Sequence, residues 1–490
     1  MAQYLLGIDV GTTGTKTLLF SSEGTLLGSA YRPYPLHTPR VGFSEQQAED
    51  WWQAVVQTVR EVVKTPETGG QVAAVSLSLQ GGTVVPVDKD FRPLRPAMVW
   101  NDTRCAAQKK ALEAECCSGK ALYEKTGWAL IDGLPLLQAR WLRENEPEIF
   151  EKTHMFLTVP DYISMKMTGI PAADLSDAGI NQFIDIQKGD YDDALLEFAG
   201  IRREQLPKLV PSGEVIGNLT GAAAAELGLS TRCVLVSGAH DQYAVALGAG
   251  ASREGDILIG SGTCWVVTAI CGRPDFSRGL SQSVAAVPGM WGSLLSLSSG
   301  GVCLEWLRKN LPEADASYEV LNDRIARVRA AEDGLFFYPF SGRSREDASF
   351  RKGSFVGLDL SHDRFHMARA IMEGVVFQVL WMLEAFPAKP SAEGLKLTGG
   401  ASKSPAWSRL LADISGLPVR IPEVADMACV GAAILAGVGC GLYKDAAEGY
   451  KALAVRERVI RPDPEKTALY RPIQAQYRKI AGILGEAYGL

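Results

Sequence analysis

The stretch "YLLGIDVGTTGTK", residues 4–16, decides how the chain begins to fold. It runs through apolar residues to Asp9 and then through glycines and threonines to Lys16, where a second apolar run begins. Small residues expose backbone N–H groups and hydroxyls without bulk, as a polyphosphate requires for close approach. The stretch predicts two strands joined by a phosphate-binding turn, with Asp9 placed to hold magnesium and Lys16 to add positive charge. An ordinary hairpin, whose acid is satisfied by turn amides, is the alternative.

The segments that follow predict further strands and a helix. Apolar and β-branched residues predict a third strand over 25–34 and a fourth over 71–79. Between them, residues 44–64 carry apolar side chains at helical spacing, and Ser44 and Gln47 fit a capping box at the start of that helix. The predicted order is therefore β-β-β-α-β, which is typical of a mixed α/β domain.

A second copy of the opening pattern appears about 250 residues later. The stretch "GDILIGSGTCWVVTAI", residues 255–270, again has a strand, a Gly/Ser/Thr turn and a strand, and Gly262 and Thr263 lie in the turn. We therefore expect two related α/β domains, over residues 1–247 and 248–490, with their turns facing one another.

Two more glycine clusters occur in the second half of the chain. They are "SSGGVCLEWL", residues 298–307, and "TGGASKSP", residues 398–405. After the second cluster, Ser404 suits a helix N-cap, Pro405 the first helical position and Gly416 the helix end. Each cluster alone favours a tight turn. Together, the four glycine-rich turns of the chain favour a nucleotide site.

An acid also stands between an apolar strand and an apolar helix in "VLVSGAHDQYAVALGAG", residues 234–250. Asp241 in this place is either a helix cap or a general base that takes a proton from a hydroxyl as its oxygen attacks phosphorus. Gln242 beside it would hydrogen-bond the same substrate. His240 is interpreted as a turn or packing residue.

Length and composition exclude several classes of protein. The 490 residues suffice for two to four domains, and residues 103–230 look like helical insertions. A net charge of −6 without a basic patch argues against a nucleic-acid partner. Neither a signal peptide nor an apolar run of about 18 residues is evident, which argues against a membrane partner. Nine cysteines without a C-x-x-C motif predict neither a disulfide framework nor a zinc site, so we expect a cytoplasmic chain with reduced thiols.

These motifs, in this order, make the chain resemble the FGGY family of carbohydrate kinases. The resemblance runs from "GIDVGTTGTK" through "GAHDQ" and "GSGT" to "TGGASKSP", and "GSFVGLDLSHDRFHMARAIMEG", residues 353–374, fits the family's long C-terminal signature. Gln138 departs from the family, which usually has Lys there. The resemblance implies an α/β, two-domain, actin-like (ribonuclease H-like) ATPase fold with a cleft between the domains. It also implies phosphorylation of a sugar with ATP and Mg²⁺, and it suggests a homodimer.

The resemblance assigns roles to residues at matching positions. The first domain would serve the sugar and the phosphates, and the second the nucleotide. Asp9 would hold the metal and Asp241 would be the catalytic base. The phosphates and the nucleotide would lie against Thr12, Thr13, Gly14, Lys16, Gly262, Thr263, Gly301, Glu305, Gly400 and Ser404. The sugar would lie against Gly81, Gly82, Trp100, Asn101, Asp241 and Gln242.

The segment around the expected sugar site indicates a ketopentose. "LRPAMVWNDTRC", residues 94–105, is similar to the xylulokinase version of this segment within the family. Xylulokinases usually present Met-His, and glycerol kinases an Arg-Glu pair, where this chain has Gly81 and Gly82; the two glycines are expected to enlarge the pocket. The leading hypothesis is phosphorylation of D-xylulose to D-xylulose 5-phosphate. A kinase for glycerol, ribulose, gluconate or another sugar or polyol, and a nucleotide-dependent binding protein that transfers nothing, are the alternatives.

Overall fold

The computed structural model describes residues 3–310, 317–331, 334–340, 353–424, 426–453 and 455–487. Its contacts divide the chain into two compact units. The predicted boundary after residue 247 lies close to the end of the first segment of unit 1, but two later segments also return to that unit. Unit 1 combines Met1–Ser252, Gly272–Gly292 and Val424–Val455, and unit 2 combines Arg253–Cys271, Ser293–Glu423 and Arg456–Leu490.

Unit 1 is built on a six-stranded sheet that starts with the predicted hairpin. Its order is β13-β14-β5-β1-β2-β3. β1 pairs antiparallel with β2 and parallel with β5, which in turn pairs parallel with β14. The register sets Asp9 opposite Lys16 on one side and beside Ser78 on the other. The six strands are β1 (Tyr4–Val10), β2 (Gly14–Ser21), β3 (Leu26–Pro33), β5 (Val72–Leu79), β13 (Val215–Asn218) and β14 (Val234–His240).

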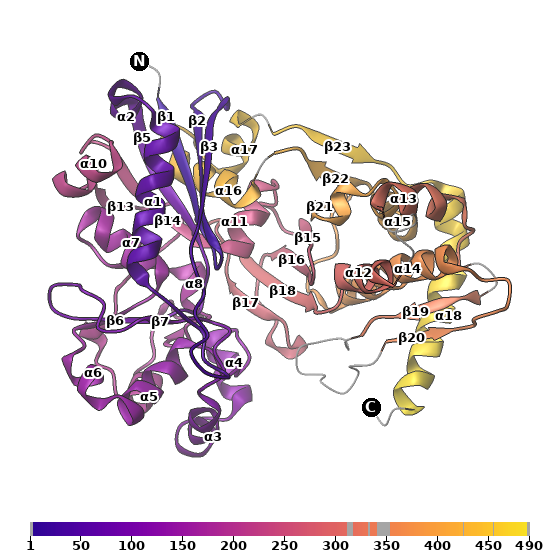
Figure 1. The fold of residues 1–490 in the computed structure, drawn as a ribbon, viewed down its shortest axis with the longest axis horizontal. Helices are drawn as coiled ribbons and strands as arrows, with labels where there is room; N and C mark the ends of the chain where they lie inside the picture. The colour runs from indigo at the N-terminus through magenta and orange to yellow at the C-terminus, as the bar shows by residue number, and fades with distance from the viewer. Residues whose placement is uncertain are drawn as a thin grey trace. The chain divides into compact units, whose positions relative to one another are not determined.

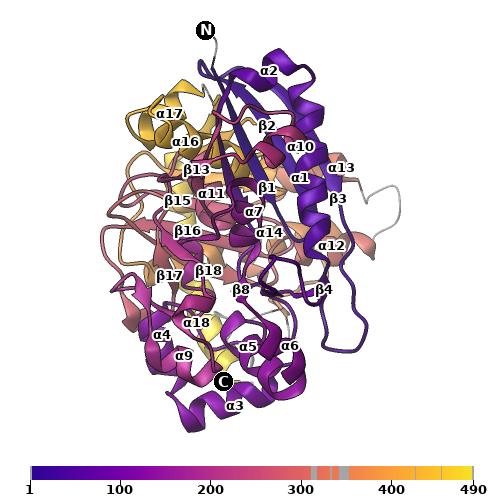
Figure 2. The ribbon, with the colours of Figure 1, turned by 90° about the vertical axis from the view of Figure 1, so that its left-hand side faces the viewer.

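Helices cover both faces of this sheet. Figure 2 shows α1 and α10 on one side and α16 with α17 on the other. Figure 1 shows the orange-yellow α16, from late in the sequence, beside the indigo strands of its beginning. The approach is so close that a Cβ on Gly7 of β1 would lie 1.9 Å from the carbonyl oxygen of Cys429. The helices are α1 (Ala48–Val63), α2 (Pro66–Gln71), α7 (Val159–Thr168), α10 (Gly221–Leu227), α11 (Asp241–Gly248), α16 (Met427–Gly439) and α17 (Ala446–Ala452).

The first helix begins later than the sequence predicted. α1 starts at Ala48 with Gln47 as its N-cap, because the two preceding residues form the short strand β4 (Glu45–Gln46). β4 pairs antiparallel with β7 (Ala97–Met98). The predicted capping box at Ser44 was therefore wrong, since extended pairing with a distant segment holds these residues outside the helix.

Helices dominate the stretch 103–230, as predicted, with short strands among them. Several of its side chains, Leu112, Leu137 and Phe156 among them, belong to a separate apolar cluster that also includes Val84 and Met98. The remaining elements of unit 1 are β6 (Val85–Val87), α3 (Ala106–Glu115), α4 (Gly119–Thr126), α5 (Pro135–Asn145), α6 (Pro147–Lys152), β8 (Met155–Leu157), β9 (Ala172–Asp174), α8 (Leu175–Ala178), β10 (Ile184–Asp185), β11 (Asp190–Tyr191), α9 (Asp193–Ala199), β12 (Lys208–Val210) and β17 (Ser281–Val284).

Unit 2 repeats the strand plan of unit 1. Its strands follow the order β18-β16-β15-β21-β22-β23. β15 pairs antiparallel with β16 and parallel with β21, which pairs parallel with β22. The two hairpins matched in the sequence analysis therefore occupy the same place in the two sheets. The strands are β15 (Ile257–Ser261), β16 (Trp265–Cys271), β18 (Trp291–Leu297), β21 (Leu395–Gly399), β22 (Val419–Pro422) and β23 (Glu457–Ile460).

The helix after the third glycine cluster, α15, has the predicted ends. Ser404 is its N-cap, Pro405 its first residue, and Gly416, with a φ of 70°, ends it. The positive φ explains the glycine, because other residues rarely adopt it. The elements outside the sheet of unit 2 are α12 (Gly301–Lys309), α13 (Tyr318–Arg327), β19 (Phe336–Tyr338), β20 (Ser354–Val356), α14 (Arg364–Met382), α15 (Pro405–Ser415) and α18 (Pro464–Ala487).

The sequence predicted neither a membrane-spanning segment nor a disulfide framework. In the part of the chain that the structure describes, no helix has both the length and the apolar composition that a membrane span needs. All nine cysteines are free, and five of them, Cys105, Cys233, Cys271, Cys303 and Cys429, are buried.

Candidate active site

The carboxyl ends of three parallel strands bring the predicted acids of unit 1 to one edge of its sheet. Val10 of β1 pairs with Leu79 of β5, which pairs with His240 of β14. Asp9 lies one residue before the end of β1, and Asp241 directly follows β14. Because such an edge is where ligands bind in open α/β sheets, the two acids have the placement that a catalytic site needs.

Asp9 is held where its ionised form is disfavoured. Its Oδ1 accepts a hydrogen bond from the Ser78 hydroxyl at 2.7 Å. Burial, and then the negative charges of Asp426 and Asp241, raise the pKa of Asp9 to about 7. A carboxyl group with this pKa changes its charge near neutral pH, and a cation bound beside it would favour its ionised form.

Asp426 is a residue of this edge that the sequence analysis missed. Its Oδ2 accepts a hydrogen bond from Lys16 Nζ at 2.8 Å, and its Oδ1 caps α16 by accepting the Cys429 N–H at 3.0 Å. Burial lowers the pKa of Lys16, but the hydrogen bond and charge of Asp426 raise it above its usual value. The only signal in the sequence was an acid just before an apolar, small-residue helix, which is typical of an ordinary N-cap.

The threonine loop after β1 is tied down by side chains from other elements. Trp100 Nε1 donates to Thr12 Oγ1 at 3.1 Å, and Gln46 Nε2 donates to the Thr12 carbonyl at 2.7 Å. Thr13 is exposed, whereas Gly14 is buried, and a Cβ on Gly14 would lie 2.5 Å from the Arg32 carbonyl oxygen. Gly14 therefore lets β3 approach, while Thr12 and Thr13 present the polar surface of the loop.

Asp241 begins α11, but its neighbour caps the helix. His240 is the N-cap, and its Nδ1 accepts the Gln242 N–H at 3.3 Å. The same nitrogen lies 3.1 Å from Asp241 Oδ1. Burial lowers the pKa of His240, so the ring is neutral at physiological pH. Because His240 supplies the cap and the Asp241 side chain is 39% exposed, the carboxylate is accessible for chemistry.

The segment with Trp100 and Asn101 divides into exposed and structural residues. Trp100 is half-buried and Asn101 is exposed. The next acid, Asp102, is fully buried and forms an ion pair with Arg104 at 2.7 Å. Gln138, which stands where the family usually has Lys, donates from Nε2 to the Gly133 carbonyl at 3.0 Å. The buried pair and the glutamine support the segment, and Trp100 and Asn101 are the residues it presents.

The two glycines at 81 and 82 do not enlarge a pocket. A Cβ on Gly81 would lie 2.4 Å from Asp177 Oδ1. Gly82 has a φ of +71°, and a Cβ there would lie 3.1 Å from a methyl carbon of Leu134. The expectation of a wider pocket was wrong, because neighbouring side chains already fill the space that larger residues would take.

Trp128 is a second residue of this region that the sequence analysis missed. Its indole ring lies 5.7 Å from the ring of His240, measured between centroids, and its Nε1 donates to Ser283 Oγ at 3.1 Å. Gln182 Nε2 donates to the carbonyls of Trp128 and Ala129. A half-buried ring fixed beside the residue that precedes Asp241 is placed to form an apolar wall. An isolated tryptophan after Thr-Gly carries no such signal in the sequence.

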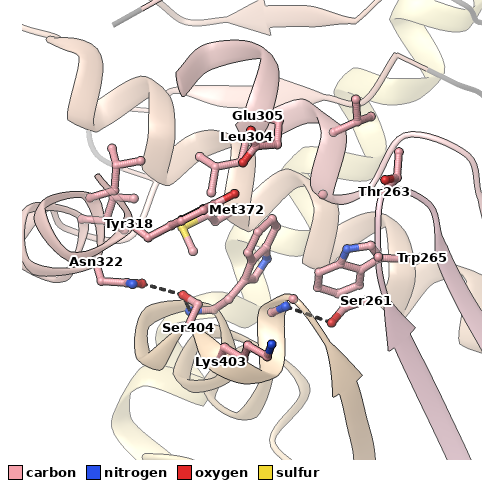
Figure 3. Close-up of a pocket in the computed structure, with 18 of the residues that line it drawn as sticks. Ser261, Thr263, Trp265, Leu304, Glu305, Tyr318, Asn322, Met372, Lys403 and Ser404 are labelled. Atoms are coloured by element: carbon pink, nitrogen blue, oxygen red, sulfur yellow. Dashed lines mark hydrogen bonds between the residues drawn. The ribbon is translucent and has the colours of Figure 1, made fainter. Parts of the chain in front are cut away.

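All six residues of unit 2 that were predicted to surround a nucleotide line one cavity of about 620 Å³. Figure 3 shows this cavity between Tyr318, Asn322 and Met372 on one side and Thr263 and Trp265 on the other. Its size suits a drug-sized ligand. The predicted residues that line it are Gly262, Thr263, Gly301, Glu305, Gly400 and Ser404.

Main-chain contacts hold the two glycine loops at the mouth of this cavity. The Gly301 N–H donates to the Gly262 carbonyl at 3.2 Å, and a Cβ on Gly301 would lie 2.5 Å from that same oxygen. The Gly400 N–H donates to the Ser261 carbonyl at 2.6 Å, and the Ala401 N–H to Ser261 Oγ at 3.0 Å. Close backbone approach therefore explains Gly301, whereas a Cβ on Gly400 would lie at an ordinary distance of 3.4 Å from the Ser261 carbonyl oxygen.

The cavity also has an apolar wall that the sequence analysis did not identify. The rings of Trp265 and Trp407 lie 5.2 Å apart, and both residues are almost fully buried. Asn322 Oδ1 accepts a hydrogen bond from Ser404 Oγ at 2.5 Å, as Figure 3 shows. In the sequence, these residues have the spacing of ordinary core residues of helices and strands, so the pattern could not distinguish them from the hydrophobic core.

The surroundings of Asp9 fit a magnesium ion. The negative charges of Asp426 and Asp241 disfavour the ionised form of Asp9, and a divalent cation at Asp9 would offset that repulsion. Within the described ranges, no group of three or more His, Cys, Asp or Glu side chains is arranged to hold a metal alone. Magnesium commonly binds through one or two carboxylates, waters and substrate phosphates, so Asp9 suits this ion and not a closed metal cage.

Two family models match most of this chain. Residues 4–248 match the N-terminal domain, and residues 256–440 the C-terminal domain, of the FGGY family of carbohydrate kinases. The chain is 30% identical to a gluconokinase of Bacillus subtilis over 458 residues, 90% of this chain and 88% of the relative. It is also 30% identical to an L-xylulose/3-keto-L-gulonate kinase of Escherichia coli over 499 residues, 99% of this chain and 98% of the relative.

Among solved structures, a xylulose kinase from Rhodospirillum rubrum matches with a TM-score of 0.92, at 29% identity and over the full length of both chains. This match confirms the expected α/β fold of the actin-like ATPase type. The two family domains together span most of the sequence. The chain therefore belongs to the FGGY family of carbohydrate kinases.

Proposed function

We propose that this carbohydrate kinase transfers the γ-phosphate of ATP to a terminal hydroxyl of D-xylulose, giving D-xylulose 5-phosphate. The observation that carries the proposal is the accessible Asp241 carboxylate at the same sheet edge as Asp9. The choice of D-xylulose is supported by the Trp100-Asn101 segment and by the likeness to a protein named xylulose kinase.

In this proposal, the base and ribose of ATP bind in the cavity of unit 2. Trp265 and Trp407 provide apolar surface for the base, and the amide of Asn322, oriented by Ser404, provides hydrogen bonds. Gly262 and Thr263 contact the phosphates from unit 2. Gly301, Glu305 and Gly400 line the same cavity around the nucleotide.

In unit 1, the threonine loop is the proposed phosphate contact. Thr12 and Thr13 present hydroxyls, and Lys16 adds a positive charge. Asp9 would hold Mg²⁺ directly or through water. When bound, this ion would neutralise the charge that develops on the transferred phosphoryl group.

The acceptor sugar binds beside Asp241 in the proposed mechanism. Asp241 takes the proton of the terminal hydroxyl as its oxygen attacks the γ-phosphate, and Gln242 orients the sugar. Trp100 and Asn101 line the acceptor site, and Gly81 and Gly82 let Asp177 and Leu134 pack close behind it. Because phosphoryl transfer needs little covalent help from the protein, positioning and charge neutralisation supply the catalysis.

Other acceptors remain as a second candidate function. Two relatives that are each 30% identical to this chain are named gluconokinase and L-xylulose/3-keto-L-gulonate kinase. A sugar acid or an L-ketose is therefore the alternative acceptor that the comparisons favour.

The test is a panel of acceptors assayed with the purified protein. ADP release would be measured with ATP and Mg²⁺ and with D-xylulose, L-xylulose, 3-keto-L-gulonate, D-gluconate, ribulose or glycerol. We expect the highest kcat/KM for D-xylulose, with a product phosphorylated at O5 by NMR. A higher value for any other acceptor contradicts the choice of sugar. ADP release that is equal with every acceptor and without one contradicts phosphoryl transfer to a sugar and favours a nucleotide-dependent binding protein.

A further inference from the structure

Lys16 is predicted to contact phosphate, but in the structure its ammonium group is hydrogen-bonded to Asp426, a residue from a distant part of the sequence. Asp426 Oδ2 accepts its hydrogen bond at 2.8 Å, and 410 positions separate the two residues. We propose that Asp426 is a positioning residue that holds Lys16 at the threonine loop for the phosphates of the nucleotide. This inference rests on the phosphate-binding role proposed for Lys16.

The helix that carries Asp426 is fixed against both catalytic elements of unit 1. A Cβ on Gly7 of β1 would lie 1.9 Å from the Cys429 carbonyl oxygen of α16. A Cβ on Gly248 of α11 would lie 1.9 Å from the Met427 carbonyl oxygen. No side chain would fit at either glycine, so the backbones pack directly against one another. The N-terminus of α16 is therefore held against the strand of Asp9 and against the helix that Asp241 begins.

Asp426 uses its two carboxylate oxygens for different tasks. Oδ1 accepts the Cys429 N–H at 3.0 Å and caps the helix. Oδ2 accepts the Lys16 ammonium, and Cys429 Sγ lies 3.4 Å from the Lys16 carbonyl oxygen as a second contact between α16 and β2. A cap needs only one acceptor oxygen, which Asn or Ser supplies as well. The negative charge on the second oxygen is therefore the part of Asp426 that capping does not explain.

The ion pair restricts a side chain that is otherwise flexible. Lysine has a long stem and loses much rotamer freedom when its ammonium is fixed. The Lys16 side chain is 32% exposed, and that of Asp426 is 18% exposed. The ammonium has three N–H donors, so a bond to Asp426 leaves donors for phosphate oxygens. The ion pair with Asp426 thus orders the Lys16 side chain before the nucleotide binds.

The test is a double-mutant cycle with Asp426→Asn and Lys16→Met. Asn keeps an oxygen for the cap and removes the charge. Asp445→Asn is the matched control, because Asp445 caps α17 through the same kind of contact, to the Glu448 N–H at 2.8 Å. Binding of Mg²⁺ with a non-hydrolysable ATP analogue is measured by titration calorimetry, alongside kcat and KM and a thermal melt.

We expect Asp426→Asn to weaken binding of the analogue and to lower kcat/KM for ATP, each by about tenfold, without shifting the melt. Asp445→Asn should leave both within about twofold of the parent chain. In the Lys16→Met background, Asp426→Asn should no longer weaken binding or lower kcat/KM, because the charge then has no lysine to position and its repulsion of Asp9 is also gone.

Three results would overturn the proposal in different ways. Normal binding in Asp426→Asn together with a defect in Lys16→Met shows that Asp426 only caps α16. Independent, additive losses in the double variant show that Asp426 acts by another route. Normal binding and turnover in Lys16→Met itself show that the proposed phosphate role of Lys16 is wrong. If Asp426→Asn melts early, Asp426→Ser, which also keeps a cap oxygen, takes its place in the cycle.

Discussion

The hairpin β1–β2 of unit 1 and the hairpin β15–β16 of unit 2 occupy the same place in two sheets of the same plan. In each, the first strand pairs antiparallel with the second and parallel with a strand from much later in the chain. Their side chains differ sharply. Asp9 lies opposite Lys16 in the first hairpin, whereas Gly260 lies opposite Val266 at the matching position of the second.

The two turns also have different surroundings. Charged side chains surround the first turn, since Asp426 and Asp241 lie close enough to help raise the pKa of Asp9. The second turn borders a cavity of about 620 Å³ with two tryptophans in its wall. The difference teaches that the glycine-threonine hairpin is a generic frame. The side chains brought to it from elsewhere decide whether its surroundings are charged, as at Asp9, or largely apolar, as at the cavity.

The largest effect should come from the charged site. Asp241→Asn should lower sugar phosphorylation by roughly 10²–10⁴-fold, the usual value of a positioned general base, because an amide cannot accept the proton. The measurement is the initial rate at saturating ATP with the best acceptor, together with a thermal melt and nucleotide binding, which should both be unchanged.

A matched control separates base catalysis from a local helix effect. Asp193 is the first residue of α9, as Asp241 is the first residue of α11. Asp193→Asn should leave the rate unchanged. A folded Asp241→Asn protein with a near-normal rate would mean that Asp241 is not the base and that the two hairpins do not divide the work as proposed.

A smaller effect is expected from the cavity. Gly301→Ala places a Cβ 2.5 Å from the Gly262 carbonyl oxygen, so the loop or α12 must shift. The KM for ATP should rise by about tenfold, while the KM for the acceptor stays within about twofold. Gly260→Ala is the control, because its Cβ would meet nothing nearer than the Val266 carbonyl oxygen at 3.7 Å. Equal KM values for ATP in the two variants would argue that this cavity does not bind the nucleotide.

The smallest effect is on stability and follows from the raised pKa of Asp9. A carboxyl group with a pKa of about 7 in the folded protein, against 3.8 as its ordinary value, makes the metal-free protein lose stability as the pH rises from about 4 to about 7. Above pH 7 the loss is complete. Asparagine cannot ionise, so the gain in Tm of Asp9→Asn over the parent, measured in EDTA, should be about 2–4 °C larger at pH 8 than at pH 5.

Asp190 provides a control of the opposite sign. A hydrogen bond from the Tyr191 N–H, and then the Arg203 guanidinium, hold the pKa of Asp190 below its usual value. Its contribution to stability is therefore present above about pH 4 and constant between pH 5 and 8. Asp190→Asn should show a Tm difference from the parent that does not change over this range. A pH-independent Tm difference for Asp9→Asn as well would mean that Asp9 is ionised throughout, like an ordinary surface acid.

Local patterns predicted the parts of the fold that depend on neighbouring residues. The ends of α15 at Ser404, Pro405 and Gly416 were predicted correctly, because capping chemistry acts within a few residues. The capping box at Ser44 was wrong for the converse reason. Residues 45–46 pair with residues 97–98, and a pairing between segments so far apart in the chain cannot be recognised from the neighbouring residues.

The sequence by itself determined the two glycine-threonine hairpins, the strand that ends near Asp9 and the junction at Asp241, because each is a contiguous pattern of apolar, small and acidic residues. Only the tertiary structure decided that Asp426 holds Lys16, that Asp177 and Leu134 fill the space at Gly81 and Gly82, and that Trp265 and Trp407 share one cavity. The physical reason is that hydrogen bonds and packing act through space. A motif can predict which backbone a segment adopts, but the side chains that surround it come from strands and helices tens to hundreds of residues away.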